Sequence, residues 1–298
     1  MIKYLKYICL TILSSLLITE SKCEIKAVIF DIGGVLCKTD KKAFAKEIFG
    51  VKDICYLGAY SVYYLDFTIW KFQERVLNLM SEIEQQIPTE DGLILRHGQT
   101  QLPKIMCKWF RGELTGNQVN DIVQKYIQNQ ADQNPNKFKN KVEQEVLSKV
   151  VRIMFDENKL ASHSKPIDGM VTILKELQNS KKDYKIFILS NWSQLSFEKL
   201  FNAEHTKPVF DYFKDKLEHV FISGDKKVIK PSRVAYKNVL AYAKEKYNID
   251  PSECLMIDDQ PENIESAIHY CGMQGVVFNN NFTTLRAALT NYRVLEKA

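Results

Sequence analysis

The sequence is that of a folded, globular chain of moderate size. Its 298 residues are enough for one large domain or two smaller ones, and its composition of 45% hydrophobic and 26% charged residues is typical of a chain with a packed core. The formal charge of +5 is mild and spread along the chain. The dense basic stripe with interleaved aromatics that indicates a nucleic-acid-binding protein is missing, so we expect no nucleic-acid partner.

The first 21 residues have the order of a secretory signal peptide. Lys3 and Lys6 precede an apolar run over residues 7–18, and small and polar residues follow that run. The run is short for a bilayer span, and its order predicts cleavage after residue 21. We therefore expect an exported protein, periplasmic or secreted, without a stable membrane span. An uncleaved chain would instead be membrane-anchored or cytoplasmic.

The seven cysteines do not form a metal-binding pattern. Cys9 lies in the predicted signal peptide, and the others are scattered without a CxxC pair, which argues against a zinc site. In a chain of this size we expect most of them to be small buried hydrophobic residues, although export would allow one or two disulfides.

The segment after the predicted signal peptide reads as a buried strand. Residues 24–30 are apolar and rich in β-branched side chains, and they lead directly into Asp31. Such near-continuous hydrophobicity predicts a strand that is covered on both faces of a parallel sheet. Gly33-Gly34 then ends the strand.

Residues 39–164 show helical rather than strand spacing. Thr115 and Gln118 resemble a capping box that opens a helix over residues 117–127. The patch at 55–64 is ambiguous between helix and strand. Helical spacing is also found over residues 67–86, 102–110 and 138–155. We expect an α-helical cap here, inserted after the first strand and called the helical insert below.

From residue 165 onward, strands and helices alternate. Strands are predicted at 184–189, 219–222, 253–257 and 275–278, and helices at 168–179, 193–202, 231–247 and 261–270. Strands separated by helices imply βαβ units and a doubly wound parallel sheet. The sequence therefore predicts an α/β fold, in which residues 24–38 and 165–298 form a Rossmann-like core.

Candidate functional side chains directly follow three of the predicted strands. These are Asp31, Ser190 and the pair Asp258-Asp259, and Lys230 directly precedes a predicted helix. The carboxyl ends of parallel strands border a common crevice, where ligands bind. We therefore expect these side chains to converge although they are far apart in sequence.

Four segments resemble the four motifs of the haloacid dehalogenase (HAD) superfamily, in the order of that family. They are FDIGGVL (30–36), ILSN (188–191), KPSRVAY (230–236) and CLMIDDQPENIESA (254–267). Together they cover roughly residues 24–38 and 165–290. WFRGELT (109–115) also resembles the turn of helical caps in the branch that includes sugar-phosphate phosphatases and the epoxide-hydrolase N-terminal domain.

The resemblance implies a Mg²⁺-dependent hydrolase with Asp31 as the nucleophile. A phosphate monoester is negatively charged and repels a carboxylate, and a divalent cation between them offsets that repulsion. By resemblance, the metal ligands are Asp31, the backbone carbonyl of Gly33 and Asp259. Asp258 is implied to orient Lys230 or a metal-bound water, and we count it with the metal site.

The resemblance also implies a phosphate-binding set. The hydroxyl of Ser190 and a backbone N–H near Asn191 would donate to phosphoryl oxygens, and Lys230 would add a positive charge and hold Asp31 in place. The implied product is an aspartyl-phosphate, which water then splits.

Two positions depart from the family pattern. Most phosphatases of the superfamily carry a second Asp two residues after the nucleophile, where this chain has Gly33. General acid–base catalysis of the kind that this Asp provides contributes about 10²–10⁴-fold. Lys227 lies near the place where relatives often have a glycine.

Three readings of the function remain open at this stage. The first is a phosphatase that acts on a small phosphorylated metabolite. The second is a 2-haloacid dehalogenase, a reaction that needs neither a metal nor an acid at Gly33, although the retained Asp258-Asp259 pair argues against it. The third is a weakly active or inactive binding protein that keeps the fold. The sequence predicts neither the exact substrate nor an oligomeric state.

Overall fold

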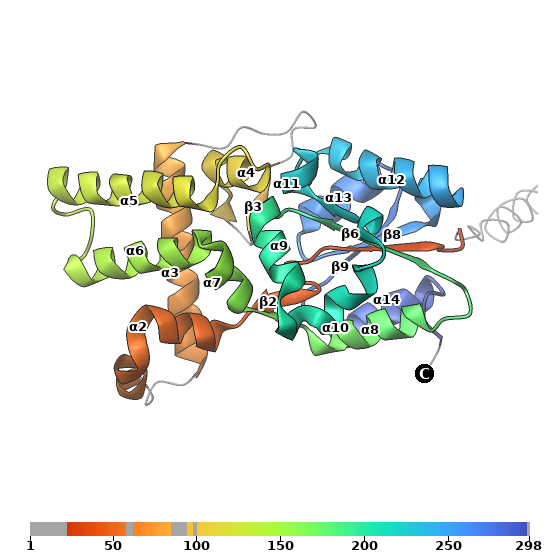
Figure 1. The fold of residues 1–298 in the computed structure, drawn as a ribbon, viewed down its shortest axis with the longest axis horizontal. Helices are drawn as coiled ribbons and strands as arrows, with labels where there is room; N and C mark the ends of the chain where they lie inside the picture. Colours follow the sequence, from red (N-terminus) through yellow and green to blue (C-terminus); the bar gives the residue numbers. More distant parts are fainter. Residues whose placement is uncertain (1–22, 58–61, 85–93, 98–99, 297–298) are drawn as a thin grey trace, which may run out of the picture.

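The structure is a computed structural model that describes residues 23–57, 62–84, 94–97 and 100–296 (Figure 1). The predicted signal peptide, residues 1–21, lies outside the described residues. Within the described ranges, no helix is both long enough and apolar enough to cross a membrane. A sheet with helices on its two sides occupies one half of the picture, and the helical insert occupies the other (Figure 1).

A parallel sheet of five strands forms the centre of the described core. Its strands are β1 (Ala27–Phe30), β6 (Lys185–Ser190), β7 (Val220–Ile222), β8 (Cys254–Asp258) and β9 (Gln274–Val277), in the spatial order β7-β6-β1-β8-β9. The chain builds outward from β1 to β7 and then returns to the other side of β1. A reversal of this kind opens a crevice at the carboxyl ends of the strands that flank it. The predicted doubly wound parallel sheet is confirmed.

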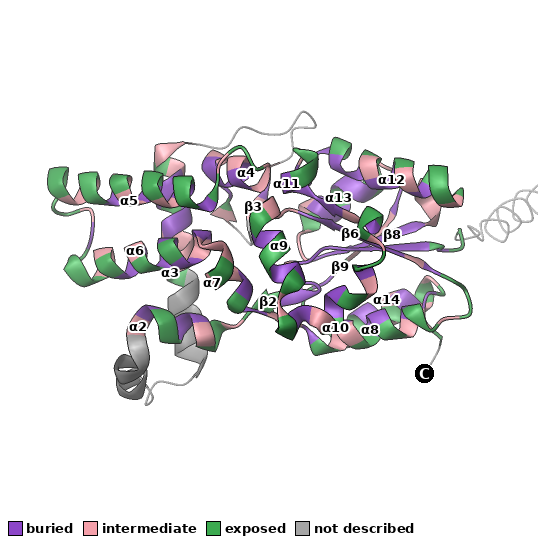
Figure 2. Ribbon diagram, viewed as in Figure 1, coloured by how far each residue is buried: buried purple, intermediate pink, exposed green. Residues whose placement is uncertain are grey.

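The central strand β1 is buried along its whole length (Figure 2). Its side chains alternate between two hydrophobic clusters, one with each layer of helices. Val28 and Phe30 pack with α8 (Asp168–Gln178), α9 (Gln194–Asn202) and α14 (Phe282–Asn291). Ala27 and Ile29 pack with α12 (Arg233–Tyr247) and α13 (Pro261–His269). Burying an apolar side chain of this size contributes about 1.5–3 kcal/mol, so β1 is firmly held. Two short helices, α10 (Lys207–Phe210) and α11 (Ser223–Lys226), also belong to the core.

The elements of the core differ from their predicted bounds mainly at their ends. The third core strand was expected from residue 219, but a 3-10 turn over Leu217–His219 precedes it. The helix expected from residue 231 begins at Arg233, because Ser232 caps it by accepting a hydrogen bond from Val234 N. Local hydrogen bonds, rather than hydropathy, set these ends.

Helices also fill the stretch between β1 and β6. They are α2 (Lys41–Leu57), α3 (Val62–Ile83), α4 (Lys104–Phe110), α5 (Gly116–Gln133), α6 (Lys141–Phe155) and α7 (Glu157–Ser162), together with the short hairpin of β3 (Arg96–His97) and β4 (Thr100–Gln101). These elements share a hydrophobic cluster of their own, which also includes Ile229 from the core. The ambiguous patch at 55–64 is helical wherever its backbone is described.

The predicted capping box at the start of α5 is confirmed. Thr115 Oγ1 accepts a hydrogen bond from Gln118 N at 3.2 Å, and Gln118 Oε1 accepts one from Thr115 N at 2.8 Å. These two bonds satisfy amides that the first turn of a helix leaves without partners. The helix begins at Gly116 and continues past its predicted end to Gln133.

The insert joins the core through two linkers that lie side by side. β2 (Cys37–Thr39) pairs antiparallel with β5 (Ser164–Pro166) in a small sheet of two strands. The boundaries predicted from the sequence, at residues 38–39 and 164–165, fall within these strands. Both crossings of the chain therefore lie at one edge of the core.

Candidate active site

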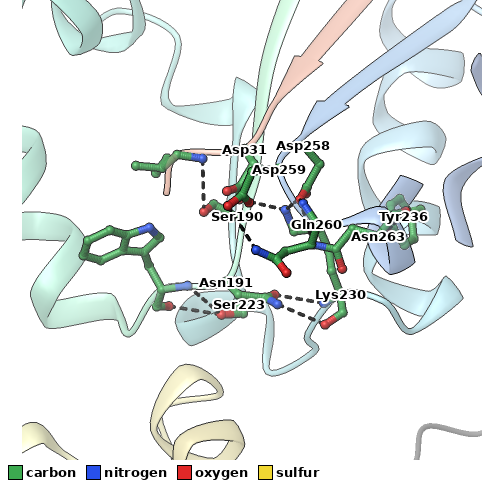
Figure 3. Close-up of polar contacts among 12 residues, drawn as sticks. Asp31, Ser190, Asn191, Ser223, Lys230, Tyr236, Asp258, Asp259, Gln260 and Asn263 are labelled. Atoms are coloured by element: carbon green, nitrogen blue, oxygen red, sulfur yellow. Dashed lines mark hydrogen bonds and ion pairs between the residues drawn. The ribbon is translucent and has the colours of Figure 1, made fainter. Parts of the chain in front are cut away.

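Strands β1 and β8 place two carboxylates next to each other at the crevice. Asp31 directly follows β1, and its backbone N–H continues the ladder by donating to Ile257 O at 3.0 Å. Asp258 is the last residue of β8. Because Phe30 pairs with Ile257 in the sheet, Asp31 and Asp258 lie at the same level of neighbouring strands (Figure 3).

A buried lysine connects these two carboxylates. Lys230 Nζ donates to Asp31 Oδ1 at 2.7 Å and to Asp258 Oδ2 at 2.5 Å, and only 1% of the lysine is exposed. Burial lowers the pKa of Lys230, but Asp258 and Asp31 together outweigh it and raise the pKa above its usual value. Lys230 is therefore positively charged and fixes one oxygen of Asp31.

Asp258 is completely buried and both of its oxygens have protein partners. Oδ2 accepts from Lys230, and Oδ1 accepts from Gln260 N at 2.9 Å and Asn263 Nδ2 at 3.0 Å. Asn263 is held in turn by Tyr236, whose hydroxyl donates to Asn263 O at 2.7 Å. These contacts fix Asp258 against Lys230. The predicted part of Asp258 in the chemistry stays a prediction.

The turn after β1 brings Asp259 against the Asp31 loop. Gly34 has a positive φ of 72°, and a Cβ there would lie only 2.4 Å from Asp259 Oδ2. Glycine is therefore required at this position both for its backbone conformation and for this close contact. Gln260 Nε2 donates to the same Asp259 oxygen at 3.0 Å.

The three carboxylates form a cluster that fits a divalent cation. One ligand oxygen from each of Asp31, Asp258 and Asp259 lies within 4.8 Å of the others. The pKa of Asp31 is raised to about 6, mainly by burial and also by the charge of Asp258, although Lys230 lowers it. The pKa of Asp259 is raised to about 8, mainly by burial and then by the charges of Asp31 and Asp258. Lys230 alone does not balance this negative charge. Mg²⁺ prefers hard, negatively charged oxygen ligands such as carboxylates. Both oxygens of Asp258 already have protein partners, so Asp31 and Asp259 are the two carboxylates with oxygens left to bind a metal ion.

Ser190 ends β6 beside Asp31, as the sequence predicted. Only 2% of Ser190 is exposed, and its Oγ accepts a hydrogen bond from Ile32 N at 3.4 Å. A hydrogen bond with Ser190 also lowers the pKa of Asp31, although burial has the larger, opposite effect. Ser190 thus lies in the same crevice as the nucleophile candidate (Figure 3).

The side chain of Asn191 has a role that the sequence did not predict. Its Nδ2 donates to Lys230 O at 2.9 Å, and its Oδ1 accepts from Lys230 N at 2.9 Å. The side-chain amide of Asn191 therefore binds both the backbone carbonyl and the backbone N–H of Lys230. The predicted contribution of Asn191, a backbone N–H directed at a phosphoryl oxygen, stays a prediction.

The two departures from the family pattern have different structural settings. A Cβ at Gly33 would meet only Asp31 Oδ2, at the ordinary contact distance of 3.8 Å, so there is space for a Cβ there. Lys227 has a left-handed backbone with φ of 61°, the conformation that glycine adopts most readily. It ends α11, and its Nζ donates to Gly224 O at 2.6 Å.

The sequence did not reveal the residues that bind the candidate site residues and their loops and keep them in position. Gln260 and Asn263 support Asp258, and Ser223 contacts the loop after β6. Asn263 belongs to the DDxxxN motif, so the motif itself could have indicated it. Ser223 follows a predicted strand just as Ser190 does, which is the same signal in weaker form.

A parallel α/β sheet with a carboxylate–lysine–carboxylate site at the carboxyl ends of its strands defines a class of hydrolases. The chain belongs to one family of that class. The family model described as a haloacid dehalogenase-like hydrolase matches residues 25–269, which confirms the predicted superfamily. The narrower branch stays a prediction. A search of curated protein sequences found no match.

Solved structures with similar folds include several HAD enzymes. One is a HAD family enzyme from Bacteroides thetaiotaomicron, with 17% identity over 88% of this chain and 98% of that chain and a TM-score of 0.47. Another is a predicted HAD-like family hydrolase from Porphyromonas gingivalis, with 16% identity over 93% and 100% of the two chains and a TM-score of 0.48. A third is an L-2-haloacid dehalogenase from Xanthobacter autotrophicus, with 14% identity over 90% of this chain and 83% of that chain and a TM-score of 0.44.

Proposed function

We propose that this hydrolase is a Mg²⁺-dependent phosphatase that transfers the phosphoryl group of a small phosphorylated metabolite to Asp31. The observation that carries the proposal is the group of three carboxylates, only two of which pair with the buried lysine. A cluster with this much negative charge is unfavourable in a buried crevice unless a cation joins it. A negatively charged ester is the substrate for which such a cation is useful.

Each residue of the site has a part in the proposed reaction. Lys230 holds Asp31 Oδ1 and keeps the carboxylate oriented, and Asp258 keeps Lys230 in place. Asp31 forms a bond to phosphorus as the bond to the leaving oxygen breaks, which gives an aspartyl-phosphate. Ser190 would donate its hydroxyl to a phosphoryl oxygen, as a backbone N–H near Asn191 would.

A metal ion held by Asp31, Asp259 and the carbonyl of Gly33 would offset the repulsion between carboxylate and phosphate. The carboxylates supply the hard oxygen ligands for it. Because Gly34 has no side chain, Asp259 can lie close against the Asp31 loop. The loops after β1 and β8 are thus already in place for a shared ligand.

Turnover of p-nitrophenyl phosphate and a panel of sugar phosphates, with Mg²⁺ or with EDTA, tests the proposal. We expect turnover with Mg²⁺ that is lost in EDTA and that falls at least about a thousandfold in Asp31→Asn, because the covalent route needs the nucleophile. Asp215→Asn, at an exposed position of the core, is the matched control and should keep native turnover. Halide release from a 2-haloacid without metal would instead identify a dehalogenase.

Gly33 allows a second and sharper test of phosphatase chemistry. Because no side chain at this position can protonate a leaving group, the native chain should favour phosphate esters whose leaving group departs readily, such as aryl esters. A Cβ at this position would make only ordinary contact with Asp31 Oδ2. We expect Gly33→Asp to speed alkyl phosphate hydrolysis at least about tenfold, within the range of general acid catalysis, and to change aryl phosphate hydrolysis little. Equal effects on both esters would contradict the proposal.

A further inference from the structure

Gln260 directly follows the two acidic residues at the end of β8 and directly precedes α13. Its backbone is fixed by two hydrogen bonds: the N–H donates to Asp258 Oδ1 at 2.9 Å, and the carbonyl accepts from Asn263 N at 3.1 Å. Pro261 is the first residue of the helix. The backbone of Gln260 therefore has a defined position beside the candidate metal site (Figure 3).

The side chain of Gln260 contacts Asp259 rather than the helix that it precedes. A residue at this position, the N-cap, commonly uses a short polar side chain to accept a hydrogen bond from an amide of the first turn. The side chain of Gln260 makes no such bond. Its Nε2 instead donates to Asp259 Oδ2 at 3.0 Å. The side chain can therefore be replaced without the loss of a helix cap.

The two oxygens of Asp259 have different surroundings. Oδ2 accepts the hydrogen bond from Gln260, and it also lies so close to Gly34 that a Cβ there would come within 2.4 Å. Oδ1 accepts no hydrogen bond from any group of the residues that the structure describes. The carboxylate of Asp259 thus offers a cation one open oxygen.

Asp31 likewise has one oxygen that is already bound. Lys230 Nζ donates to its Oδ1 at 2.7 Å. An ammonium group and a divalent cation repel each other at short range, so Oδ2 is the oxygen of Asp31 that can bind a cation. Each of the two carboxylates expected to bind the metal ion therefore does so through a single oxygen.

Carboxylates that offer one oxygen each suit Mg²⁺ better than Ca²⁺. Mg²⁺ requires near-ideal octahedral geometry, keeps several waters and is usually bound through one or two carboxylates. Ca²⁺ binds about 6–8 oxygens in a more flexible geometry, and a carboxylate that turns both oxygens to the ion supplies two of them. The hydrogen bond from Gln260 opposes this second arrangement at Asp259.

We propose that Gln260 is a positioning residue that restricts Asp259 to one metal-binding oxygen and thereby makes the site prefer Mg²⁺ over Ca²⁺. A group that hydrogen-bonds to a metal ligand orients it, and its loss typically changes metal affinity about 10–100-fold. Without the amide of Gln260, Asp259 is free to turn. Mg²⁺ then loses an oriented ligand, whereas Ca²⁺ gains a second oxygen that offsets this loss. The inference rests on the metal site of the proposed function.

Titration calorimetry of the full chain with MgCl₂ and with CaCl₂, without substrate, tests the proposal. Gln260→Met has a side chain of similar length without an N–H, and it keeps both backbone hydrogen bonds. We expect Mg²⁺ to bind about tenfold more weakly and Ca²⁺ to bind within about twofold of the native chain. Gln178→Met, at the exposed end of α8, is the matched control and should leave both affinities unchanged. Equal weakening of both cations, or an unchanged preference, would overturn the proposal.

The number of waters on a bound Eu³⁺ ion tests how many oxygens Asp259 supplies. Eu³⁺ is similar in size to Ca²⁺, and its luminescence lifetimes in H₂O and D₂O give the number of bound waters. We expect about one water fewer in Gln260→Met than in the native chain, because the second oxygen of Asp259 replaces it. Gln178→Met should match the native chain. The same number of waters in the native chain and in Gln260→Met would contradict the proposed restriction.

The cation titrations also separate this proposal from the proposed function. If Gln260→Met loses the preference for Mg²⁺ but the native chain hydrolyses no phosphate ester, the proposed function fails and the role of Gln260 stands. If the native chain hydrolyses phosphate esters with Mg²⁺ while Gln260→Met binds both cations equally less well, the role of Gln260 is wrong and the proposed function stands. A native chain that binds neither cation would overturn both.

Discussion

Lys230 is a charged side chain in an environment where an isolated charge is very unfavourable, since only 1% of it is exposed. Its two carboxylate partners, Asp31 and Asp258, are themselves buried. A buried ion pair adds little net stability compared with an apolar replacement, but the removal of one member leaves the others without compensation. The three side chains therefore depend on one another for their charged states.

We predict that Lys230→Met destabilises the folded state and abolishes turnover. The two carboxylates would remain buried without their cation, which is expected to lower the unfolding free energy by about 3–5 kcal/mol at pH 7. Turnover should fall at least about a hundredfold, because Asp31 loses the group that orients it. Urea denaturation in EDTA and steady-state kinetics measure the two effects. Lys237→Met, on the exposed side of α12, should change neither.

The side chain of Asn191 binds the backbone of Lys230. We predict that Asn191→Ala lowers kcat about tenfold with little change in KM for p-nitrophenyl phosphate, because two hydrogen bonds that hold Lys230 are lost. Asn179→Ala, at the exposed end of α8, should behave like the native chain. A rise in KM at constant kcat would show instead that Asn191 acts on substrate binding.

At the scale of single elements, the ends of helices are decided by individual hydrogen bonds. The start of α5 is a clear case, because Thr115 and Gln118 satisfy each other's backbone amides. Nothing in the hydropathy of this segment sets the first helical residue, whereas the capping pair does. The same holds for α12, which begins after Ser232.

We predict that Thr115→Ala lowers the unfolding free energy by about 1 kcal/mol, which is typical for the loss of a helix cap. Because Thr115 lies in the insert and touches none of the candidate site residues, turnover per folded molecule should be unchanged. The midpoint of urea denaturation measures the first effect and steady-state kinetics the second. Lys125→Ala, at an exposed position within the same helix, should shift the midpoint little; a shift equal to that of Thr115→Ala would rule out the capping explanation.

At the scale of the whole molecule, the site makes stability depend on pH and on metal. Without metal, the pKa of Asp31 is raised to about 6 and that of Asp259 to about 8, from ordinary values of 3.8, chiefly by burial. Both pKa values lie above those of the same groups in the unfolded chain. At a pH between the unfolded and the folded pKa, the folded state therefore binds more protons than the unfolded state. The stability that these groups contribute is complete below about pH 4 and is lost as the pH rises through 6 and 8.

We predict that Asp259→Asn and the native chain are similarly stable in EDTA at pH 4, and that the variant is the more stable of the two at pH 8. The reason is that the amide keeps the shape of the side chain but never takes on the buried charge. Mg²⁺ should stabilise the native chain at pH 8 and the variant much less, because the variant lacks a charged ligand. Urea denaturation at pH 4, 6 and 8, with and without Mg²⁺, measures this. Parallel pH profiles for the two chains would contradict the assigned pKa shift.

Much of the core was predictable because its signals are local. The apolar runs before Asp31, Ser190 and Asp258 each predict a buried strand, and the helices between them require parallel connections. Parallel strands share a carboxyl edge, so the convergence of these residues followed from chain order alone. The precise starts of α12 and β7 were missed, since single caps and a 3-10 turn decide them.

The amino-acid sequence by itself determined the family, the doubly wound sheet and the residues expected at its carboxyl edge. Each of these depends on the order of residues within short segments, and such order is independent of how distant segments meet. Only the tertiary structure decided that Asn191 holds the backbone of Lys230 and that Ser223 joins the insert to the loop after β6. These contacts join residues that are far apart in the chain, and each depends on two atoms lying within hydrogen-bond distance. A local pattern of hydrophobicity or charge does not determine the distance between atoms of distant segments.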